Sequence, residues 1–329
     1  MALNWHPTAS IATLRERAKI LKRIRLFFDE RGFWEVETPA LSHDTVVDKY
    51  LEPIMVSPRA AGPNDESTGD RPMYLQTSPE FGMKRLLAAG ADQIYQICKS
   101  FRAGEIGDRH NIEFTMLEWY EAGTDYQSGM DRLAEFAKFT FSVEACDRLT
   151  YREAFVKHAQ IDPFAIGIDE LRQATMKMGK TTESTSAKMD RDECLNVLMG
   201  CIVEPNLGML TPVIISDWPA SQSALAIIRR AGEFQYAERF ELYYRGIELA
   251  NGYHELTDAA QLTSRNLDVN RFRKADGRRA LPDDSRLISA MESGMPDSVG
   301  VAFGVDRLVM LLLGLNAISD VIAFPFDRA

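Results

Sequence analysis

The sequence lacks any apolar run of the roughly 18–20 residues that a helix needs to cross a bilayer. Its longest strongly apolar stretch runs only from Leu308 to Leu315 and follows a charged pair. The opening residues, MALNWHPTAS, also lack the basic and apolar regions of a secretory signal. We therefore expect neither a membrane segment nor a secretory signal.

Cysteine and histidine are scarce, and neither is spaced as a metal site requires. The four cysteines form no CxxC pair, so we expect no structural zinc site and no disulfide framework, as suits a reducing cytoplasm. His110 and His254 lack metal-ligand spacing with the other histidines. The sequence also has no P-loop, dinucleotide-binding or nucleophile-elbow motif, so any nucleotide site is of another kind.

The balance of charge is acidic. The net charge is −10, with 48 acidic and 38 basic residues. Proteins that bind nucleic acid mainly through its phosphates usually carry a basic face. The charge therefore disfavours tRNA as the main partner and suits a cationic substrate or a basic protein partner.

Periodicity predicts helices and antiparallel strands along the chain, which indicates an α+β fold. A first helix, capped by Ser10, is predicted to have one apolar face made of Leu14, Ala18, Leu21, Ile24 and Phe28. Strands are predicted at 33–37, 73–77, 94–101, 113–120, 213–216, 238–244, 246–250 and 298–303. Residues 58–72 are rich in Pro, Gly, Asp and Ser, which predicts a mobile loop, and 129–209 look mostly helical.

Charged side chains crowd the predicted hairpin FRAGEIGDRHNIEFTMLEWYE, residues 101–121. Alternation allows Arg102 on one strand and Glu118 and Tyr120 on the other to face one pocket. Arginine suits an anionic reacting centre because its planar fork grips two oxygens at once. An ordinary charged surface hairpin would have the same composition.

The segment ERFELYYRGIELANGYHEL, residues 238–256, carries two acids seven positions apart. If Glu241 and Glu248 lie on neighbouring strands, both carboxylates can point to one face and hold Mg²⁺ together with substrate phosphates. Asn251, Tyr253 and Glu255 alternate, so they share a face. A solvated acidic edge strand is the alternative.

The segment SVGVAFGVDRLVMLLLG, residues 298–314, predicts a strand that runs into a helix. Gly300 and Gly304 permit close approach of a backbone or ligand. Arg307 lies near the helix start, where a cation gains nothing from the helix dipole unless an anion binds beside it. A buried turn with the arginine reaching solvent would also fit.

In order, these segments resemble the motifs of class II aminoacyl-tRNA synthetases. RGFWEVETPAL, with Pro39, resembles motif 1, FRAGEIGDRHNIEFTMLE motif 2, and GVAFGVDRLVM motif 3. RHNIEFTMLE and GVDRLVML resemble the lysyl branch, and the resemblance covers nearly the whole chain. The first helix begins within the first twenty residues, which leaves no room for the N-terminal OB-fold anticodon-binding domain of lysyl-tRNA synthetases. EWYEAG and VIAFPFDRA resemble the stand-alone paralogues that attach β-lysine to translation elongation factor P.

The resemblance implies a single catalytic domain, 1–329, that uses ATP and Mg²⁺ to activate (R)-β-lysine or lysine as an adenylate. The aminoacyl group would pass to a lysine ε-amine of elongation factor P, in a cytoplasmic homodimer, without tRNA or membrane. Arg102 and Arg307 would be catalytic, and Glu241 and Glu248 would bind the metal. ATP would contact Arg102, Ala103, Gly104, Glu105, Arg109, His110, Asn111, Phe114, Glu248, Leu249, Gly304 and Arg307. The amino acid would contact Ser78, Pro79, Glu80, Glu118, Tyr120, Asn251, Tyr253, Glu255 and Ala302.

Three positions depart from the pattern of the tRNA-charging enzymes. Ser78 stands where Ala is expected and Ala302 where Gly is expected, which fits a pocket reshaped for a displaced amino group. Gly104 stands where motif 2 usually has an acid, and Glu105 follows one residue later. Two other readings stay open: a truncated synthetase that charges tRNA, and a regulatory paralogue without catalysis. Retention of Arg102 and Arg307 argues against the inert form.

Overall fold

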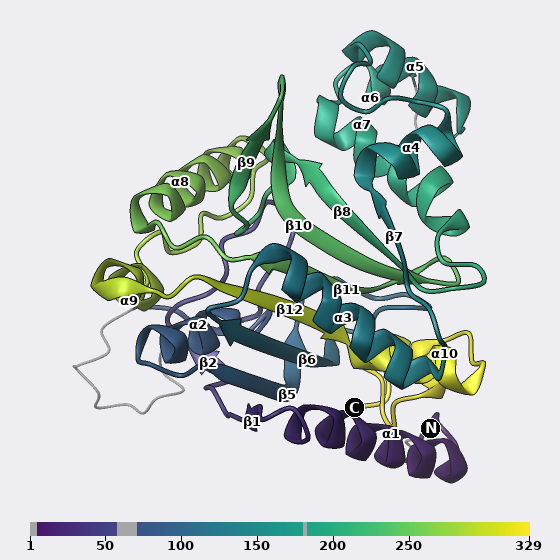
Figure 1. The fold of residues 1–329 in the computed structure, drawn as a ribbon, viewed down its shortest axis with the longest axis vertical. Helices are drawn as coiled ribbons and strands as arrows, with labels where there is room; N and C mark the ends of the chain where they lie inside the picture. Colours follow the sequence, from purple (N-terminus) through teal and green to yellow (C-terminus); the bar gives the residue numbers. More distant parts are fainter. Residues whose placement is uncertain (1–4, 58–70, 180–182) are drawn as a thin grey trace. The chain divides into compact units, whose positions relative to one another are not determined.

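The computed structural model describes residues 5–57, 71–179 and 183–329 (Figure 1). The chain forms two compact units, one made of Met1–Thr124 with Leu256–Ala329 and the other of Asp125–Glu255. The predicted loop at 58–72 lies outside the described residues except for its last two positions. That the whole chain is a single domain stays a prediction.

The first unit opens with helix α1, Ile11–Asp29, the purple helix of Figure 1. The Ser10 side chain accepts a hydrogen bond from the backbone N–H of Thr13 at 3.0 Å, which confirms the predicted cap. Ile24 and Phe28 are buried as predicted, but Ala18 is exposed. The buried stripe instead turns towards Ile20 and Phe27, because these larger side chains reach the aromatic core.

The first unit holds four paired strands in the order β1-β5-β6-β12. They are β1 Trp34–Glu35, β5 Gln93–Phe101, β6 Glu113–Ala122 and β12 Ser298–Gly304. β1 is parallel to β5, and the other pairs are antiparallel, so the predicted hairpin of β5 and β6 is confirmed. A smaller sheet pairs β2 Leu41–Ser42, β4 Met73–Leu75 and β3 Met55–Val56.

Helices complete this unit, and aromatic contacts join α1 to the sheet. The remaining helices are α2 Glu80–Ala88, α8 Ala259–Ala275, α9 Arg286–Gly294, α10 Val305–Leu313 and the 3₁₀ turn η5 Ile318–Asp320. The Phe28 ring centroid lies 4.9 Å from that of Tyr95 on β5 and 5.2 Å from that of Trp119 on β6. Such pairs add to the burial energy and fix α1 against the hairpin that carries the site.

The second unit combines strands with helices (Figure 1). Its strands are β7 Asp147–Thr150, β8 Val213–Pro219, β9 Ile228–Ala231, β10 Phe234–Tyr244 and β11 Ile247–His254, in the order β11-β10-β8-β7 with β9 beside β10. Its helical segments are α3 Tyr126–Phe141, α4 Tyr151–Ala159, α5 Ile168–Lys177, α6 Glu183–Ser186, α7 Arg191–Leu198, η2 Met199–Val203, η3 Glu204–Asn206 and η4 Ala220–Gln222. The core of the unit gathers around Tyr151, Phe155 and Trp218.

The predicted α+β class is confirmed, but three of the predicted strands begin later or end earlier than predicted. The strand predicted at 33–37 is limited to Trp34 and Glu35, although the Val36 N–H still donates to the Tyr95 carbonyl at 2.8 Å, because it lies at the end of the strand order and then leaves towards Pro39. The strand predicted at 73–77 ends at Leu75. β11 begins at Ile247 and not at Gly246, because Gly246 has φ +67° and belongs to the turn after β10.

Candidate active site

The first unit's sheet presents a polar surface on β6 and β12. Glu118 and Tyr120 alternate along β6, so their side chains leave the sheet on the same face. Ala302 on β12 lies opposite Glu118, and Gly300 lies opposite Tyr120. These small residues leave space for a ligand beside the two larger β6 side chains.

Glu118 is a buried acidic side chain on this surface, with only 1% of its area exposed. The Ser78 hydroxyl donates to its Oε1, and the Tyr120 hydroxyl donates to its Oε2 at 3.0 Å. Burial raises the pKa of Glu118 to about 8; the charge of Glu80 acts in the same direction, and Lys84 opposes both. A carboxyl tuned in this way can ionise when an ammonium group binds beside it.

Glu80 begins α2, two residues after Ser78, and contacts it. Its backbone N–H donates to the Ser78 hydroxyl oxygen at 3.1 Å. Its carboxylate forms an ion pair with Lys84 one turn later, and the side chains are 11% and 2% exposed. Lys84 was not among the predicted site residues, although its four-residue spacing from Glu80 places both on one helix face.

Arg102 directly follows β5, where the loop towards β6 begins. Its Nε donates to the Thr77 carbonyl at 3.4 Å, and its guanidinium carbon lies 5.0 Å from the centroid of the Phe114 ring. A carboxylate oxygen of Glu105 lies 3.8 Å from Nη1 of Arg102. Gly104 has φ +80°, a conformation that few other residues adopt, in the turn between these two charges. An acid therefore stands beside Arg102 even though Gly104 occupies the usual acidic position.

The far end of this loop meets α10. Arg307 lies in the first turn of α10, as predicted, and its Nη2 is 2.6 Å from Nε2 of His110. The Asn111 amide donates to the Glu113 carbonyl at 2.7 Å and accepts from the Phe326 N–H at 3.0 Å. Asn111 thus fixes the loop against the end of the chain. Arg109 is exposed at the loop tip.

Asp306 anchors the helix that carries Arg307. It is 2% exposed, and its Oδ2 accepts a hydrogen bond from the Thr115 N–H on β6 at 2.7 Å. Its Oδ1 lies 2.6 Å from Nη2 of Arg17 on α1, and the same guanidinium nitrogen donates to the Thr115 hydroxyl at 2.8 Å. These bonds hold α1, β6 and the start of α10 together. Nothing in the local sequence around position 306 reveals the partner at position 17.

In the second unit, Glu241 on β10 is buried with 3% exposed. Arg239 and the Tyr243 hydroxyl donate to its two oxygens, one to each. Burial raises the pKa of Glu241 to about 7, Arg239 opposes that rise, and the like charge of Glu248 adds to it. Arg239 and Tyr243 were not among the predicted site residues, although both alternate with Glu241 along the strand and so share its face.

A bulge brings Glu248 to this cluster. β10 and β11 are antiparallel neighbours, as predicted, and Glu241 lies opposite Asn251. The register shifts after Leu242, so that Tyr243 faces Glu248 and Leu249 is skipped. Without the bulge, residues 248 and 251 would leave β11 on opposite faces. Both carboxylates can therefore reach one cation.

Polar side chains continue along the same face of β11. The Asn251 amide donates to the Tyr253 hydroxyl at 3.0 Å and accepts from Nε of Arg239 at 3.3 Å. Glu255, just beyond the strand, is 1% exposed. The remaining predicted contact residues lie beside these groups in their own units: Pro79 before α2, Ala103 after Arg102, Gly304 at the start of α10, and buried Leu249. Their contacts with ligands stay predictions.

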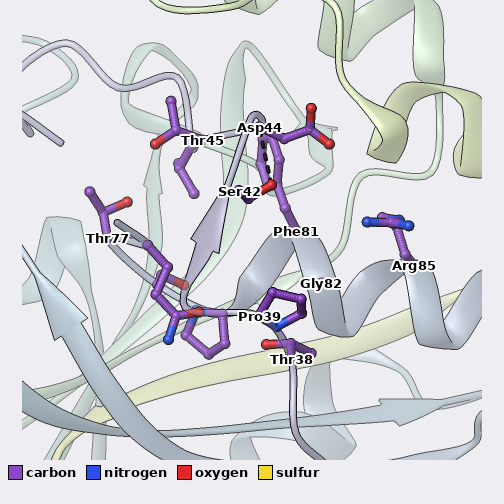
Figure 2. A pocket seen from close by; sticks show the side chains of 13 residues that line it. Thr38, Pro39, Ser42, Asp44, Thr45, Thr77, Phe81, Gly82 and Arg85 are labelled. Carbon is purple, nitrogen blue, oxygen red and sulfur yellow. Dashed lines mark hydrogen bonds between the residues drawn. The ribbon is translucent and has the colours of Figure 1, made fainter. Parts of the chain in front are cut away.

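A pocket in the first unit lies beside the Ser78 segment (Figure 2). It is lined by side chains from residues 38–46, from 76–79 and from α2. The hydroxyls of Thr45 and Thr77 line it, and within the described part of the chain neither has a hydrogen-bond partner. The pocket can therefore satisfy a small polar ligand or water.

Residues 5–57, 71–179 and 183–329 contain no group of three or more His, Cys, Asp or Glu side chains placed to hold a metal. Mg²⁺ bound by two carboxylates and substrate phosphates does not require such a group. In the same ranges no helix is long and apolar enough to cross a membrane.

Known proteins resemble this chain along almost its whole length. An elongation factor P--(R)-beta-lysine ligase from Edwardsiella ictaluri is 45% identical over 326 residues, which is 99% of this chain and 98% of the relative. The ligases of the same name from Salmonella typhi and Yersinia enterocolitica are 46% and 45% identical, with the same coverage. The family described as tRNA synthetases class II (D, K and N) matches residues 2–328. The chain therefore belongs to the class II tRNA synthetase family of the D, K and N type.

Proposed function

We propose that this protein is a ligase that uses ATP to activate (R)-β-lysine or lysine and joins it to a lysine of translation elongation factor P. The observation that carries the proposal is the identity of 45–46%, over 99% of the chain, to proteins named for that reaction. Modification of a translation factor would take place in the cytoplasm. The acidic net charge and the buried carboxylates support a cationic small-molecule substrate.

The first unit would supply the recognition of the amino acid. Glu118 is the candidate partner for a substrate ammonium group, and Ser78 and Tyr120 hold its two oxygens in place. A neutral competitor would leave this buried carboxyl without a cation, which disfavours binding. The serine hydroxyl occupies volume that the alanine of tRNA-charging relatives would leave open, which favours a substrate with a shifted amino group.

Arg102, Phe114 and Arg307 would bind ATP. The guanidinium of Arg102 offers paired donors to the α-phosphate and the substrate carboxylate, and the Phe114 ring offers a face for adenine. Arg307 would meet the terminal phosphate. Its nitrogen already lies against the His110 imidazole, which sets its direction.

Glu241 and Glu248 would hold Mg²⁺, and their surroundings fit that ion. They lie on neighbouring strands, and the charge of Glu248 makes ionisation of Glu241 harder, a repulsion that a divalent cation would remove. Arg239 and Tyr243 fix Glu241, so its remaining lone pairs face a defined direction. Bound Mg²⁺ would neutralise charge on the phosphates.

The proposed reaction has two steps. A carboxylate oxygen of the amino acid attacks the α-phosphorus, the bond to the β-phosphate oxygen breaks, and pyrophosphate leaves with the electron pair. The neutral ε-amine of the acceptor lysine then attacks the carbonyl carbon of the adenylate. AMP leaves, an amide forms, and the amine proton passes to solvent. Arg102 would stabilise the negative charge that develops in the first step.

We also propose a homodimer formed through α1 and β1. This part of the first unit exposes large apolar side chains: Ile11 is 59% exposed, Leu26 49% and Trp34 49%. Contact with a second copy would cover them. Sedimentation at micromolar protein should give twice the chain mass of 37.1 kDa, and a monomer would contradict the dimer.

The acceptor is tested by supplying ATP and radiolabelled lysine or (R)-β-lysine to the purified protein, with elongation factor P or tRNA as acceptor. We expect label on the protein acceptor alone. Label on tRNA would favour a truncated synthetase, and exchange of pyrophosphate without transfer would limit the function to adenylate formation. No exchange with either amino acid would favour a regulatory paralogue.

Arg102 is tested by pyrophosphate exchange. Arg102→Ala should lower kcat by about 10²–10³-fold, as expected for loss of a preorganised charge at the reacting phosphate. The matched control is Arg271→Ala, which removes an exposed arginine that pairs with Asp268 on α8. Near-normal exchange by Arg102→Ala would show that the motif 2 assignment is wrong.

A further inference from the structure

A buried arginine near the end of α8 binds a segment far from it in sequence. Arg273 has 0% of its area exposed. Its Nη1 donates to the carbonyls of Asp48 and Leu51, each at 3.1 Å. Its Nη2 forms an ion pair with Oε2 of Glu52 at 2.6 Å. Because an arginine is almost never fully buried unless its charge and its donors are satisfied, these bonds show that α8 holds residues 48–52 in place.

The Asp48 side chain bends this segment towards the arginine. Its Oδ1 accepts hydrogen bonds from the backbone N–H groups of Tyr50 at 2.7 Å and Leu51 at 2.8 Å. The Tyr50 ring packs edge-to-face on Phe272, the residue before the buried arginine, with ring centroids 5.7 Å apart. The segment is therefore joined to α8 by its backbone and by its side chains.

Glu52 connects this anchor to the loop that carries Arg102. The Glu52 carboxylate pairs with Arg273, and its backbone carbonyl accepts a hydrogen bond from the Ala103 N–H at 2.8 Å. Ala103 directly follows Arg102, whose own N–H donates to the Ile112 carbonyl at 2.9 Å. The backbone at Arg102 is thus held by the hairpin through one N–H and by Glu52 through the next.

The turn of the loop begins directly after the bond to Glu52. Gly104 has φ +80°, and its carbonyl accepts from the Ile106 N–H at 3.1 Å, a bond internal to the turn. The Arg102 side chain has only a long bond, 3.4 Å, to the Thr77 carbonyl. The direction of the Arg102 guanidinium therefore depends on how firmly its backbone is held.

We propose that Arg273 is a positioning residue: through Glu52 it fixes the backbone at Ala103 and thereby directs the guanidinium of Arg102 at the α-phosphate. The inference rests on the proposed function, because that function assigns the α-phosphate to Arg102. Arg273 itself contacts no substrate. A misplacement of about 1 Å at a reacting group can lower a rate about 100-fold, so a residue that only supports the site can still control the rate.

The first test compares two changes on α8. Arg273→Met removes the charge and the donors, whereas the control, Asn270→Ala, removes buried hydrogen bonds to Leu281, one in each direction at 2.9 Å. Arg273→Met should lower kcat for pyrophosphate exchange about 10–100-fold, with the KM for lysine within about twofold of the parent. Asn270→Ala should leave kcat within about twofold, measured at a temperature at which both variants are folded.

A role in stability alone would give a different result. Both variants would then unfold more easily, and kcat of the folded protein would stay near the parent value in both. That outcome, or an equal fall in kcat in the two variants, would overturn the inference. A raised KM for lysine with an unchanged kcat would also contradict it, because Arg102 is proposed to act on the reacting phosphate.

Glu52→Gln tests the same link if Arg273→Met does not fold. Glutamine keeps an oxygen that can accept from Arg273 but removes the charge, and 42% of the Glu52 side chain is exposed, so the fold should tolerate the change. It should lower kcat about fivefold, because a hydrogen bond between a charged and a neutral group is weaker than an ion pair. The control is Glu16→Gln, which weakens the exposed pair with Lys19 and should leave kcat unchanged. An unchanged kcat in Glu52→Gln would contradict the link.

Amide hydrogen exchange measures the support itself and needs neither activity nor ligand. The Ala103 amide should exchange about tenfold faster in Arg273→Met and in Glu52→Gln than in the parent. The reference within each protein is the Val36 amide, which donates to β5. Asn270→Ala should leave the ratio of the two rates unchanged, and an unchanged ratio in both test variants would overturn the inference. If the parent shows no pyrophosphate exchange, the proposed function fails, and the amide ratio still decides whether Arg273 supports Ala103.

Discussion

Replacement of Glu118 by Gln should make the protein more stable at alkaline pH while it weakens the binding of lysine. The folded protein holds this carboxyl with a pKa of about 8, against 4.5 for the free side chain, because the group is buried beside Glu80. Between these values the folded state keeps a proton that the unfolded chain has already released. Stability is therefore lost as pH rises from 4.5 to about 8.

The size of the effect follows from the same two pKa values. Between pH 5 and pH 8 the linkage amounts to about 3–4 kcal/mol of lost stability in the parent. Glutamine does not titrate, so the variant escapes this loss. Its amide can still accept one hydrogen bond but cannot accept from both Ser78 and Tyr120, which costs about 1 kcal/mol at every pH. The variant should thus equal the parent near pH 5 and be about 3–4 kcal/mol more stable at pH 8.

Urea denaturation of both proteins at pH 5, 6, 7 and 8 measures this difference. In parallel, the KM for lysine in pyrophosphate exchange should rise about 30-fold or more, because the ammonium group loses its buried partner. A difference in unfolding free energy that does not change with pH would refute the reasoning, since only a titrating group can produce the slope. A parent that gains stability from pH 5 to pH 8 relative to the variant would show that the sign of the pKa shift is wrong.

Three further changes probe other parts of the two units. Asp306→Ala should destabilise the protein by about 3–5 kcal/mol in thermal or urea unfolding, because it leaves the largely buried Arg17 without its carboxylate. Adding Arg17→Met should recover part of this loss of stability, and losses that simply add would contradict the ion pair. The Mg²⁺ concentration for half-maximal exchange should fall as pH rises from 6 to 8, because Glu241, with a pKa of about 7, must lose its proton to bind the ion. A half-maximal Mg²⁺ concentration that does not change with pH would count against Glu241 as a ligand. Gly104→Ala and Gly123→Ala both place a side chain at positive φ with open space around it, and each should lower the free energy of unfolding by about 1 kcal/mol. Only the change at Gly104 should raise the KM for ATP, and an equal KM for ATP in the two variants would show that the turn is not part of the ATP site.

Local patterns were sufficient to predict the strands that carry the site. Glu118 alternates with Tyr120, and Asn251 with Tyr253, which predicts that the two members of each pair share a face. The registers of the β5–β6 and β10–β11 pairs agree with this prediction. Ser10 as a helix cap is equally local, because its partner is only three residues away.

Parity alone could not place Glu248. An even-numbered residue on β11 should leave the sheet on the face opposite Asn251, and it is the skipped Leu249 that reverses this. A bulge depends on the pairing of two strands, so the alternation of residues along one strand does not predict it. Asp306 is beyond local patterns for a related reason: its ion-pair partner, Arg17, lies on the first helix of the chain, and only packing shows that they meet.

In the proposed function, the same local arrangement would bind a different cation in each of the two units. In each, a buried glutamate accepts a hydrogen bond from a tyrosine two residues later on its own strand: Tyr120 for Glu118 and Tyr243 for Glu241. The difference is the charged neighbour. Arg239 bonds directly to Glu241, which keeps that carboxylate ionisable and suits it to a divalent ion that two acids share.

Glu118 instead has neutral hydroxyls as its direct hydrogen-bond partners, while Lys84 is bonded to Glu80. The full electrostatic gain of ionising Glu118 is therefore available only when a cation from outside the protein arrives. An ammonium group offers one such charge with three donors, so it can satisfy the carboxylate without displacing Ser78 or Tyr120. A neutral amino-acid side chain offers no charge and would leave Glu118 protonated. On this reasoning, the proposed selectivity for a lysine-like substrate comes from a buried carboxyl whose direct hydrogen-bond partners are neutral hydroxyls.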